Sequence, residues 1–386
     1  MKSIVFVGMD VHKSGFTLSC LQPELFIEDR FFGHMTVKPS AGEVKRYLDR
    51  IQDRYKKQTG GELRFICGYE AGCMGYALYH DLARLGIDCF ILAPTSMPKY
   101  PANTIKTDKR DSEHIAKCLA YGNYKSVYVP DLMDEQVRDY IRMRNDHKGA
   151  LKGLKQQINA FCLRLGASYP SGQSKWTQRH LRWLQQLELE LIHREILDEY
   201  LITYGSLINR LEVLGRRIEE FAQEERYREE VSKLICLLGV QSLTGLSVLV
   251  ETGDFARFKS ASHYACYLGL TPGEHSSGTR IKRTQITKAG NSQVRRLLIE
   301  AAQSICKGRI GYKSKALKVR QAGPSPQVIA YADRANERLR RKYYRMIHSG
   351  KKRNVAVTAV ARELACFIWG MMTNHLDRRM AGQTCF

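Results

Sequence analysis

Four carboxylates stand where a fold could gather them. Asp10 and Glu70 each end an apolar run that is typical of a β-strand, and Asp108 and Asp111 lie three residues apart at the start of a helical pattern, hence on one face of that helix. Carboxylates held within a few ångströms repel one another unless a divalent cation lies between them. Such a set suits Mg²⁺ or Mn²⁺, and a two-metal site stabilises both the attacking and the leaving oxygen of a phosphodiester. Taken singly, Asp108 is explained as a helix cap and Asp10 as a turn residue, so only the set of four indicates a metal site.

The sequence Ser276-Ser277-Gly278 is a second candidate for chemistry. A serine hydroxyl is a weak nucleophile, but cations or a metal that stabilise the alkoxide and the charge developing on phosphorus allow it to attack a phosphodiester. Two serines before a glycine are also typical of a turn, so spacing alone leaves both interpretations open. The basic residues that follow are candidates for contacts with nucleic acid: Arg280, Lys282, Arg283, Lys288, Arg295 and Arg296.

Other polar groups have two interpretations each. His12 and Lys13 follow Asp10 and could touch a substrate, although a histidine in a loop beside a strand is more often structural or solvated. The same applies to His114 and His275. Residues 338–345 combine Arg and Lys with two tyrosines, which could cover a nucleic-acid backbone and stack on bases. A solvated helix face explains the same run equally well.

The net charge of the chain is concentrated near its C-terminus. The 61 Lys and Arg against 39 Asp and Glu give +22, and from Thr279 onward 24 basic residues face only 5 acidic ones. A field of one sign on one segment attracts polyanions, among which DNA and RNA are the commonest in a cell. A basic face that only raises solubility is the alternative.

Strands alternating with helices should position the four carboxylates. Apolar patterns predict strands over residues 4–9, 15–20, 63–69 and 88–92, and helical spacing predicts helices over 41–52, 76–85 and 108–121. This alternation indicates an α/β sheet domain over residues 1–128. Adjacent parallel strands with a flanking helix are how an RNase H-like fold gathers its carboxylates.

The rest of the chain is predicted to be mostly helical. Residues 129–232 carry leucines at spacings of three and four, which predicts two or three long helices, broken near residues 166–172, that form a coiled-coil or dimerisation region. Residues 233–386 form the third predicted domain. It begins with a glycine turn at 236–246, like the hairpin with which helix-hairpin-helix modules hold a phosphate. A basic loop over 311–325 and helices over 293–306, 328–347 and 355–372 complete it.

Composition excludes several classes of protein. Hydrophobic residues make up 44% of the chain, enough to exclude wholesale disorder. The apolar stretches are interrupted before they reach the length of a membrane span, and the N-terminus lacks the pattern of a signal peptide, so we expect a cytoplasmic protein with no membrane partner. Eleven cysteines occur singly with no C-x-x-C pair, which argues against a disulfide framework and a structural zinc site.

Taken in order, the motifs resemble a known family. They are Gly8-Met9-Asp10-Val11-His12-Lys13, Tyr69-Glu70-Ala71-Gly72, Lys106-Thr107-Asp108-Lys109-Arg110-Asp111, Gly253-Asp254-Phe255-Ala256-Arg257-Phe258, Tyr267-Leu268-Gly269-Leu270-Thr271-Pro272, Ser276-Ser277-Gly278 and Ile286-Thr287-Lys288-Ala289-Gly290-Asn291. This set resembles the DEDD transposases of bacterial insertion sequences, a family that includes the pilin-gene invertase type and the bridge-RNA-guided recombinases. The resemblance covers essentially the whole chain.

The resemblance implies a fold and an activity. It implies an N-terminal RuvC-like domain in which Asp10, Glu70, Asp108 and Asp111 bind Mg²⁺ or Mn²⁺, and a C-terminal transposase domain in which Ser277 attacks DNA and becomes covalently attached. The implied partners are donor and target DNA, a structured non-coding guide RNA, and further copies of the chain in a dimer or a dimer of dimers. The implied location is the bacterial cytoplasm, on the nucleoid when DNA is bound.

Two other functions compete with this one. In a RuvC-like resolvase, water attacks the phosphodiester and Ser277 is only a turn residue. In a catalytically silent nucleic-acid-binding protein, the basic C-terminal segment acts alone and the carboxylates are dispensable.

Overall fold

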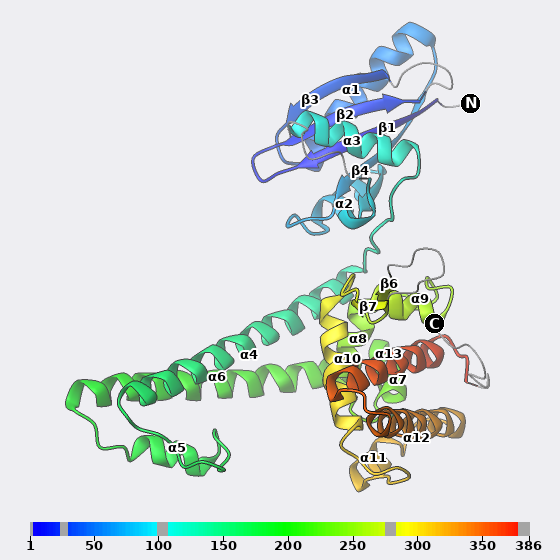
Figure 1. The fold of residues 1–386 in the computed structure, drawn as a ribbon. Helices are drawn as coiled ribbons and strands as arrows, with labels where there is room; N and C mark the ends of the chain where they lie inside the picture. Colours follow the sequence, from blue (N-terminus) through cyan, green and yellow to red (C-terminus); the bar gives the residue numbers. More distant parts are fainter. Residues whose placement is uncertain (1–2, 24–29, 99–106, 275–282, 377–386) are drawn as a thin grey trace. The chain divides into compact units, whose positions relative to one another are not determined.

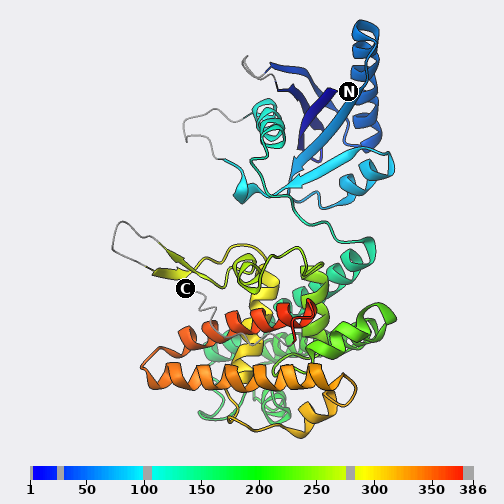
Figure 2. The same cartoon turned by 90° about the vertical axis from the view of Figure 1, so that its right-hand side faces the viewer.

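The chain is built from an α/β unit and a helical unit. The computed structural model describes residues 3–23, 30–98, 107–274 and 283–376. Its contacts divide the chain into two compact units, residues 1–129 and 130–386. The first contains a five-stranded sheet with helices on both faces, and the second is helical apart from a two-stranded sheet (Figures 1 and 2).

The sheet of the first unit combines antiparallel and parallel strands. Its order is β3-β2-β1-β4-β5, with β1 Ser3–Val11, β2 Phe16–Gln22, β3 Arg30–Val37, β4 Leu63–Glu70 and β5 Asp88–Leu92. The first three strands pair antiparallel, whereas β1, β4 and β5 run parallel. The parallel register pairs Met9 with Tyr69, so Asp10 and Glu70 come next at the carboxyl ends of neighbouring strands.

One strand, β3, is absent from the sequence-based prediction. Gly33 interrupts its alternation of apolar residues with a φ of 63°, and the register with β2 shifts between Leu18 and Cys20. Tyr47, from α1 (Ala41–Thr59), donates its hydroxyl hydrogen to the Gly33 carbonyl oxygen at this irregularity. Tertiary packing therefore stabilises a strand whose local pattern is weak.

Each face of the sheet has its own cover. On one face, Val5, Val7 and Met9 are fully buried in a core to which α1 and α2 (Ala77–Arg84) contribute. On the other face, Phe6 packs with Ile115 and Leu119 of α3 (Asp108–Ala120). Because side chains alternate along a strand, Gly8 and Asp10 lie on the same face as Phe6, the face that α3 covers.

Two glycines let α3 lie directly on the strands. Gly8 and Gly68 are paired across β1 and β4. A Cβ on Gly8 would lie 1.9 Å from the carbonyl oxygen of Ser112 and 2.4 Å from the amide nitrogen of Ala116. A Cβ on Gly68 would lie 2.9 Å from Leu119. The absence of side chains here sets the distance between α3 and the sheet.

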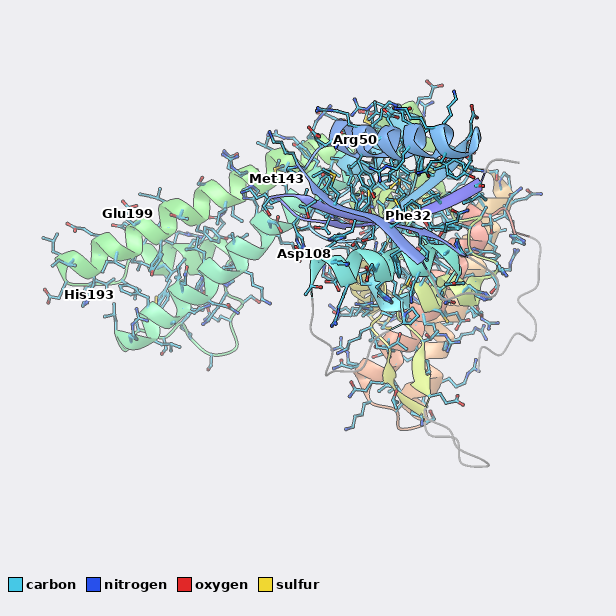
Figure 3. All side chains as sticks on the ribbon, turned by 90° about the horizontal axis from the view of Figure 1, so that it is seen from above. Phe32, Arg50, Asp108, Met143, His193 and Glu199 are labelled. Carbon is cyan, nitrogen blue, oxygen red and sulfur yellow. The ribbon has the colours of Figure 1, made fainter. Side chains whose placement is uncertain are left out.

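The second unit begins with a pair of long antiparallel helices. Helices α4 (Leu132–Arg164) and α6 (Leu191–Gln223) run side by side, with the short α5 (Gln178–Gln185) near one end (Figures 1 and 3). The beginning of α4 packs on the end of α6 around Val137 and Ile218, and the end of α4 packs on the beginning of α6 around Ile158 and Leu197. The long helices and the break between them were predicted; supercoiling remains a prediction.

The remaining elements share one core. They are α7 Glu225–Leu234, α8 Ser242–Thr252, α9 Ala261–Tyr267, β6 Pro272–Glu274, β7 Arg283–Ile286, α10 Ser292–Ile305, α11 Lys315–Arg320, α12 Pro326–His348 and α13 Arg353–Met372. Helix α13 is long and apolar enough to cross a membrane, but 61% of its most apolar stretch is buried against α7, α9, α10 and α12. Helix α11 forms inside the segment that was predicted to be a loop, and β6 and β7 were not predicted.

The glycine turn between α7 and α8 faces the interior. A Cβ on Gly239 would lie 2.3 Å from the carbonyl oxygen of Ala301, and the amide of Leu238 donates to the side chain of Asn336 at 2.8 Å. The comparison with a phosphate-binding hairpin is therefore wrong at these two residues, because both are engaged in packing α10 and α12.

We predict that Gly8→Ala displaces α3 and destabilises the first unit by about 1–3 kcal/mol, the usual cost of overpacking a core. The measurement is chemical or thermal denaturation of the full chain. The matched control is Gly42→Ala on α1, where a Cβ meets nothing within 4 Å. That change should be neutral or stabilising by up to about 1 kcal/mol. Equal effects at both positions would contradict the close approach.

Candidate active site

The four predicted carboxylates come from three adjacent elements. Asp10 is the last residue but one of β1, Glu70 ends β4, and Asp108 and Asp111 lie in the first turn of α3. Asp10 and Glu70 stand two residues after the paired glycines on the face that α3 covers. Figure 3 labels Asp108 at the beginning of α3. The fold therefore directs all four residues to one edge of the sheet.

The N-cap of α3 is Thr107, which corrects the expectation that Asp108 caps the helix. The Thr107 hydroxyl accepts a hydrogen bond from the Arg110 amide at 3.3 Å, and its backbone is extended. Threonine is a favoured N-cap, and an acidic residue in the first turn is favoured by the positive end of the helix dipole. The Asp108 carboxylate is thus exposed at the start of the helix instead of being used as its cap.

The tightest group of possible metal ligands joins β1 to α3. One ligand atom from each of Asp10, His12 and Asp108 lies within 4.8 Å of the others. His12 Nε2 lies 3.1 Å from Asp10 Oδ2, and the Asp10 side chain is only 16% exposed. The group does not include Glu70 or Asp111. The structure therefore brings Asp10 and Asp108 together and adds His12, a residue given only a minor role from sequence.

The pKa of Asp10 shows that negative charges are close together at this edge of the sheet. Burial raises the pKa of Asp10 above its usual value, and the nearby carboxylates of Asp111 and Asp108 raise it further, while His12 lowers it. Like charges at short range disfavour the ionised form of each other, and a cation reverses that effect. Asp111 is therefore part of the same electrostatic neighbourhood although it is outside the tightest group.

The two remaining carboxylates, Glu70 and Asp111, both influence the pKa of His114. Burial lowers the pKa of His114, while a hydrogen bond to the backbone of Pro98 and the charges of Asp111 and Glu70 act to raise it. Glu70 and Asp111 are thus both close enough to influence one imidazole on α3. Asp111 interacts with Asp10 and with His114, so it links the two halves of the cluster.

Buried hydroxyls fix the first turn of α3 to the sheet. Ser112 Oγ donates to the Lys109 carbonyl oxygen at 2.8 Å and shares a hydrogen bond of 2.8 Å with Ser19 Oγ of β2. Both serines are fully buried. Since Ser112 directly follows Asp111, this contact and the close packing at Gly8 together determine where the α3 carboxylates lie.

The donor set fits a divalent cation. Carboxylate oxygens suit Mg²⁺ and Mn²⁺, and an imidazole is a better ligand for Mn²⁺ than for Mg²⁺. His12 is more than half exposed and contacts Asp10, so it can hold that carboxylate in place or act as a ligand itself. An aspartate and a histidine two residues apart share one face of a strand, which is the signal that could have identified His12 from the sequence.

Comparisons with known proteins identify the family of the chain. Residues 7–165 match a family model of the DEDD type found in IS110 elements, described as "Transposase", and residues 232–318 match the "Transposase IS116/IS110/IS902 family". The chain is 36% identical to "Putative transposase y4qE" of Sinorhizobium fredii, over 95% of this chain and 88% of that protein. It is 30% identical to "Transposase for insertion sequence element IS1533" of Leptospira borgpetersenii, over 91% and 99%. The chain belongs to this transposase family.

More distant similarities are shorter. The "Pilin gene-inverting protein" of Moraxella lacunata is 28% identical over 41% of this chain and 51% of that protein. A structure titled "T. thermophilus RuvC in complex with Holliday junction substrate" aligns with 32% of this chain and 99% of that chain, at 15% identity and a TM-score of 0.21. The family model over residues 7–165 identifies the first unit as the DEDD domain of a transposase, and the strand order agrees with the α/β sheet predicted for it.

The second group of predicted site residues begins between β6 and β7 of the transposase and extends into α10. Ser277, Arg280 and Lys282 are outside the described residues, and Arg283 begins β7. Lys288 is exposed and adopts a φ of 56°, a left-handed conformation that is unusual for a side chain other than glycine. Such backbone conformations are often found at functional sites.

Arg295 and Arg296 have partners within the transposase. Arg295 Nη1 donates to the carbonyl oxygens of Leu268 and Ala289, both at 2.8 Å. Arg296 pairs with Glu300 at 3.0 Å. Six residues were predicted to contact nucleic acid, and these two of them make contacts within the protein whether or not nucleic acid binds.

We predict that Mg²⁺ or Mn²⁺ stabilises the transposase through Asp10. A ligand at 100 times its Kd adds about 2.7 kcal/mol to the free energy of unfolding. Asp10→Asn should lose most of that gain. Without metal the variant should be at least as stable as the natural protein, because the raised pKa of Asp10 means that its ionised form costs free energy in the fold near neutral pH.

The measurement is thermal unfolding with and without metal. The control is Asp49→Asn, an exposed residue of α1 that pairs with Lys45. It should keep the full response to metal. A metal response in Asp10→Asn equal to that of the natural protein would exclude the site.

Proposed function

We propose that this transposase cuts and rejoins DNA with a divalent-metal site at Asp10, Glu70, Asp108 and Asp111 and with Ser277 as the nucleophile. The observation that carries the proposal is the juxtaposition of Asp10 and Asp108 at the edge of the RuvC-like sheet, with Asp111 raising the pKa of Asp10. Mg²⁺ is the expected cation and Mn²⁺ an alternative. The cation would neutralise charge on the scissile phosphate.

The residues around the carboxylates have supporting tasks. His12 contacts Asp10 and orients its carboxylate. The Ser19–Ser112 pair and the tight packing at Gly8 hold the first turn of α3, so Asp108 and Asp111 are positioned before DNA arrives. Preorganised groups of this kind need no rearrangement during the reaction, which is where most of their catalytic effect originates.

In the proposed transfer, Ser277 exchanges one phosphoester for another. Its Oγ attacks phosphorus and loses its proton, an Oγ–P bond forms, and the bond from phosphorus to the leaving strand breaks, so that this strand ends in a hydroxyl. A hydroxyl of another strand then attacks the phosphoserine and releases the serine. The number of phosphoester bonds is unchanged, so rejoining requires no external energy source.

The base of the β6–β7 hairpin supports this role for Ser277. The Thr287 amide donates to the Thr271 carbonyl oxygen at 2.9 Å, and the Lys288 amide donates to the Gly269 carbonyl oxygen at 3.1 Å. A Cβ on Gly290 would lie 1.8 Å from the Tyr267 carbonyl oxygen, so the chain leaving β7 packs tightly on α9. The described residues on both sides of the segment that contains Ser277 are therefore fixed to the second unit.

Three further features are proposed from family membership. The transposase acts in the cytoplasm on donor and target DNA, and a structured non-coding RNA guides it. Its functional parts are residues 1–128, 129–232 and 233–386, of which the last two belong to one compact unit of the structure. Lys288 and the other predicted cations contact the DNA backbone.

We predict that Ser277→Ala lowers strand exchange by about three orders of magnitude or more and abolishes the covalent protein–DNA adduct. Ser276→Ala is the matched control and should keep most of both. DNA binding and thermal stability should change little in either variant, because one hydroxyl in a polar segment contributes little to folding. The assays are strand exchange on a junction substrate and denaturing gels that separate adduct from free protein.

The same assay separates the competing functions. If Ser277→Ala still cleaves DNA without an adduct while Asp10→Asn does not, water is the nucleophile and the protein is a RuvC-like resolvase. If Asp10→Asn and Ser277→Ala both bind and act like the natural protein, neither group is catalytic.

We also propose that the long helices hold subunits together. Leu191, Ile202 and Val213 recur every 11 residues along α6, which places them on one face of the helix, and they are 75%, 64% and 46% exposed. An exposed apolar stripe on a long helix is typical of a surface that is buried in an oligomer. A homodimer, alone or as half of a tetramer, is therefore the proposed assembly.

We predict that Leu191→Glu with Ile202→Glu weakens dimerisation at least about 100-fold, which corresponds to about 2.7 kcal/mol. Light scattering with size-exclusion chromatography measures it. The control pair is Ile310→Glu with Val319→Glu, exposed apolar residues outside the long helices. If the α6 pair remains dimeric at low concentration, the interface lies elsewhere.

A further inference from the structure

The second unit has a groove that is lined by none of the candidate active-site residues. It has a volume of about 500 Å³ and lies along α12, with Glu363 contributed by α13. Its lining residues are five cations and two carboxylates: Arg334, Arg338, Arg341, Lys342, Arg345, Glu337 and Glu363. At neutral pH the lining therefore carries a net charge of +3.

The cations form a stripe along one helix. Arg334, Arg338, Arg341 and Arg345 recur at intervals of four, three and four residues, which keeps them on one face of α12. Eleven residues of α-helix rise about 16.5 Å. The stripe is thus long enough to meet several phosphates of one nucleic-acid strand and too long for a single small anion.

Glu363 orders part of this stripe. Its side chain is only 12% exposed and accepts from Arg338 Nε and from Lys342 Nζ, the latter at 2.7 Å. Burial acts to raise the pKa of Glu363, but Lys342 and Arg338 lower it below its usual value, so the carboxylate stays ionised. One buried anion therefore fixes two cations that are one helical turn apart.

Arg338 keeps donors that its pair with Glu363 does not use. A guanidinium has five N–H groups, and the pair with Glu363 uses the Nε group. The Arg338 side chain is 57% exposed and that of Arg341 is 61% exposed. Arg341 donates Nε and Nη2 to Glu337 Oε1, at 3.1 and 2.6 Å. The donors that remain on both guanidinium groups can bind phosphate oxygens.

Three neighbouring residues of the same basic run, Arg340, Tyr343 and Tyr344, make contacts within the protein. Arg340 is 6% exposed and donates to the carbonyl oxygens of Arg309 and Tyr312, at 2.6 and 2.7 Å. The Tyr344 hydroxyl donates to the Gly308 carbonyl oxygen at 3.0 Å, and Tyr343 packs against the core. The two tyrosines therefore serve structure, and stacking of unpaired bases on them, which single-strand binding requires, is not favoured.

We propose that the α12 groove is a binding site for the phosphodiester backbone of duplex DNA, separate from the β6–β7 hairpin. Contacts to phosphates carry no sequence information, so we expect binding here to be independent of sequence. The assignment rests on the proposed function for its choice of DNA. A duplex RNA has the same phosphates and is the other source of this chemistry.

The test compares charge at the groove with equal charge elsewhere. The groove variant is Arg338→Gln, Arg341→Gln and Arg345→Gln in the full chain. The control is Arg210→Gln, Arg216→Gln and Arg228→Gln, three exposed cations of α6 and α7. Fluorescence anisotropy measures Kd for a 30-base-pair DNA duplex and for the RNA duplex of the same sequence, in EDTA and over a range of salt concentrations.

We expect the groove variant to bind DNA about tenfold more weakly or worse near 0.1 M salt. The slope of log K against log salt should become shallower by about 0.9 for each phosphate that is no longer neutralised, hence by up to about 2.7, while the control changes little. Equal weakening in both variants, no weakening in either, or weakening confined to RNA would each overturn the assignment. If the triple variant melts early, the single changes Arg341→Gln and Arg345→Gln answer the same question.

Glu363→Gln supplies an independent readout. It raises the net charge by one, so attraction by overall charge alone predicts tighter binding. The groove predicts weaker binding, because Arg338 and Lys342 lose the carboxylate that fixes them. Tighter binding would overturn the role of Glu363. The binding assay contains EDTA and no metal, and all variants keep Ser277. Its result therefore does not depend on whether the proposed catalytic residues are correct.

Discussion

The close approach of α3 to the sheet is the constraint on which the candidate active site depends. Paired glycines on β1 and β4 leave room for the helix backbone, and Ser112 and Ala116 are the residues that fill it. The packing distance of a helix on a sheet is normally set by side chains, so removing them at this pair brings the first turn of α3 down to the strand ends. The glycine of the Gly8-Met9-Asp10 motif thus has a physical role distinct from that of Asp10: it determines the distance between two groups of carboxylates.

The same arrangement lowers stability while it serves the proposed function, because it brings like charges together. The carboxylates raise the pKa of Asp10, and the fold tolerates their repulsion because hydroxyl pairs and apolar packing below the site are strong enough to hold α3 in place. The second unit also accommodates a buried carboxylate by surrounding it with hydrogen-bond donors. Glu251, whose side chain is 2% exposed, accepts two hydrogen bonds from Arg142 of α4 and one from Asn291, the N-cap of α10. Three donors offset part of the cost of burying this charge, and the contacts connect the base of the long helices to the segment that leaves the β6–β7 hairpin.

Much of this could be predicted from the sequence, for reasons that are visible in the structure. The strands β1 and β4 and the helices α3, α4 and α13 have strong local patterns, and the carboxylates end those strands or begin that helix. The missed elements depend on distant partners. Strand β3 contains Gly33 in a left-handed conformation and is stabilised by Tyr47, while β6 is only three residues long. The cap of α3 was misassigned because Thr107 and Asp108 are both good caps, and only the backbone conformation distinguishes them. The group that contains His12 was not predicted because its third member, Asp108, is 96 residues away in the sequence and reaches Asp10 and His12 only through the fold.

The basic segment shows most clearly why charge along a sequence is not charge on a surface. Arg295, Arg338 and Arg340 look equivalent in the sequence, yet Arg295 and Arg340 donate to backbone carbonyl oxygens while Arg338 lines an open groove. Burying a guanidinium requires several acceptors, and a carbonyl at the end of a helix or in a turn supplies them without a compensating negative charge. The surplus of positive charge therefore remains, and the fold concentrates it where arginines have a carboxylate on one side and solvent on the other. The position of Glu363 in the floor of the groove, more than the number of arginines, determines which of them are held ready for phosphate.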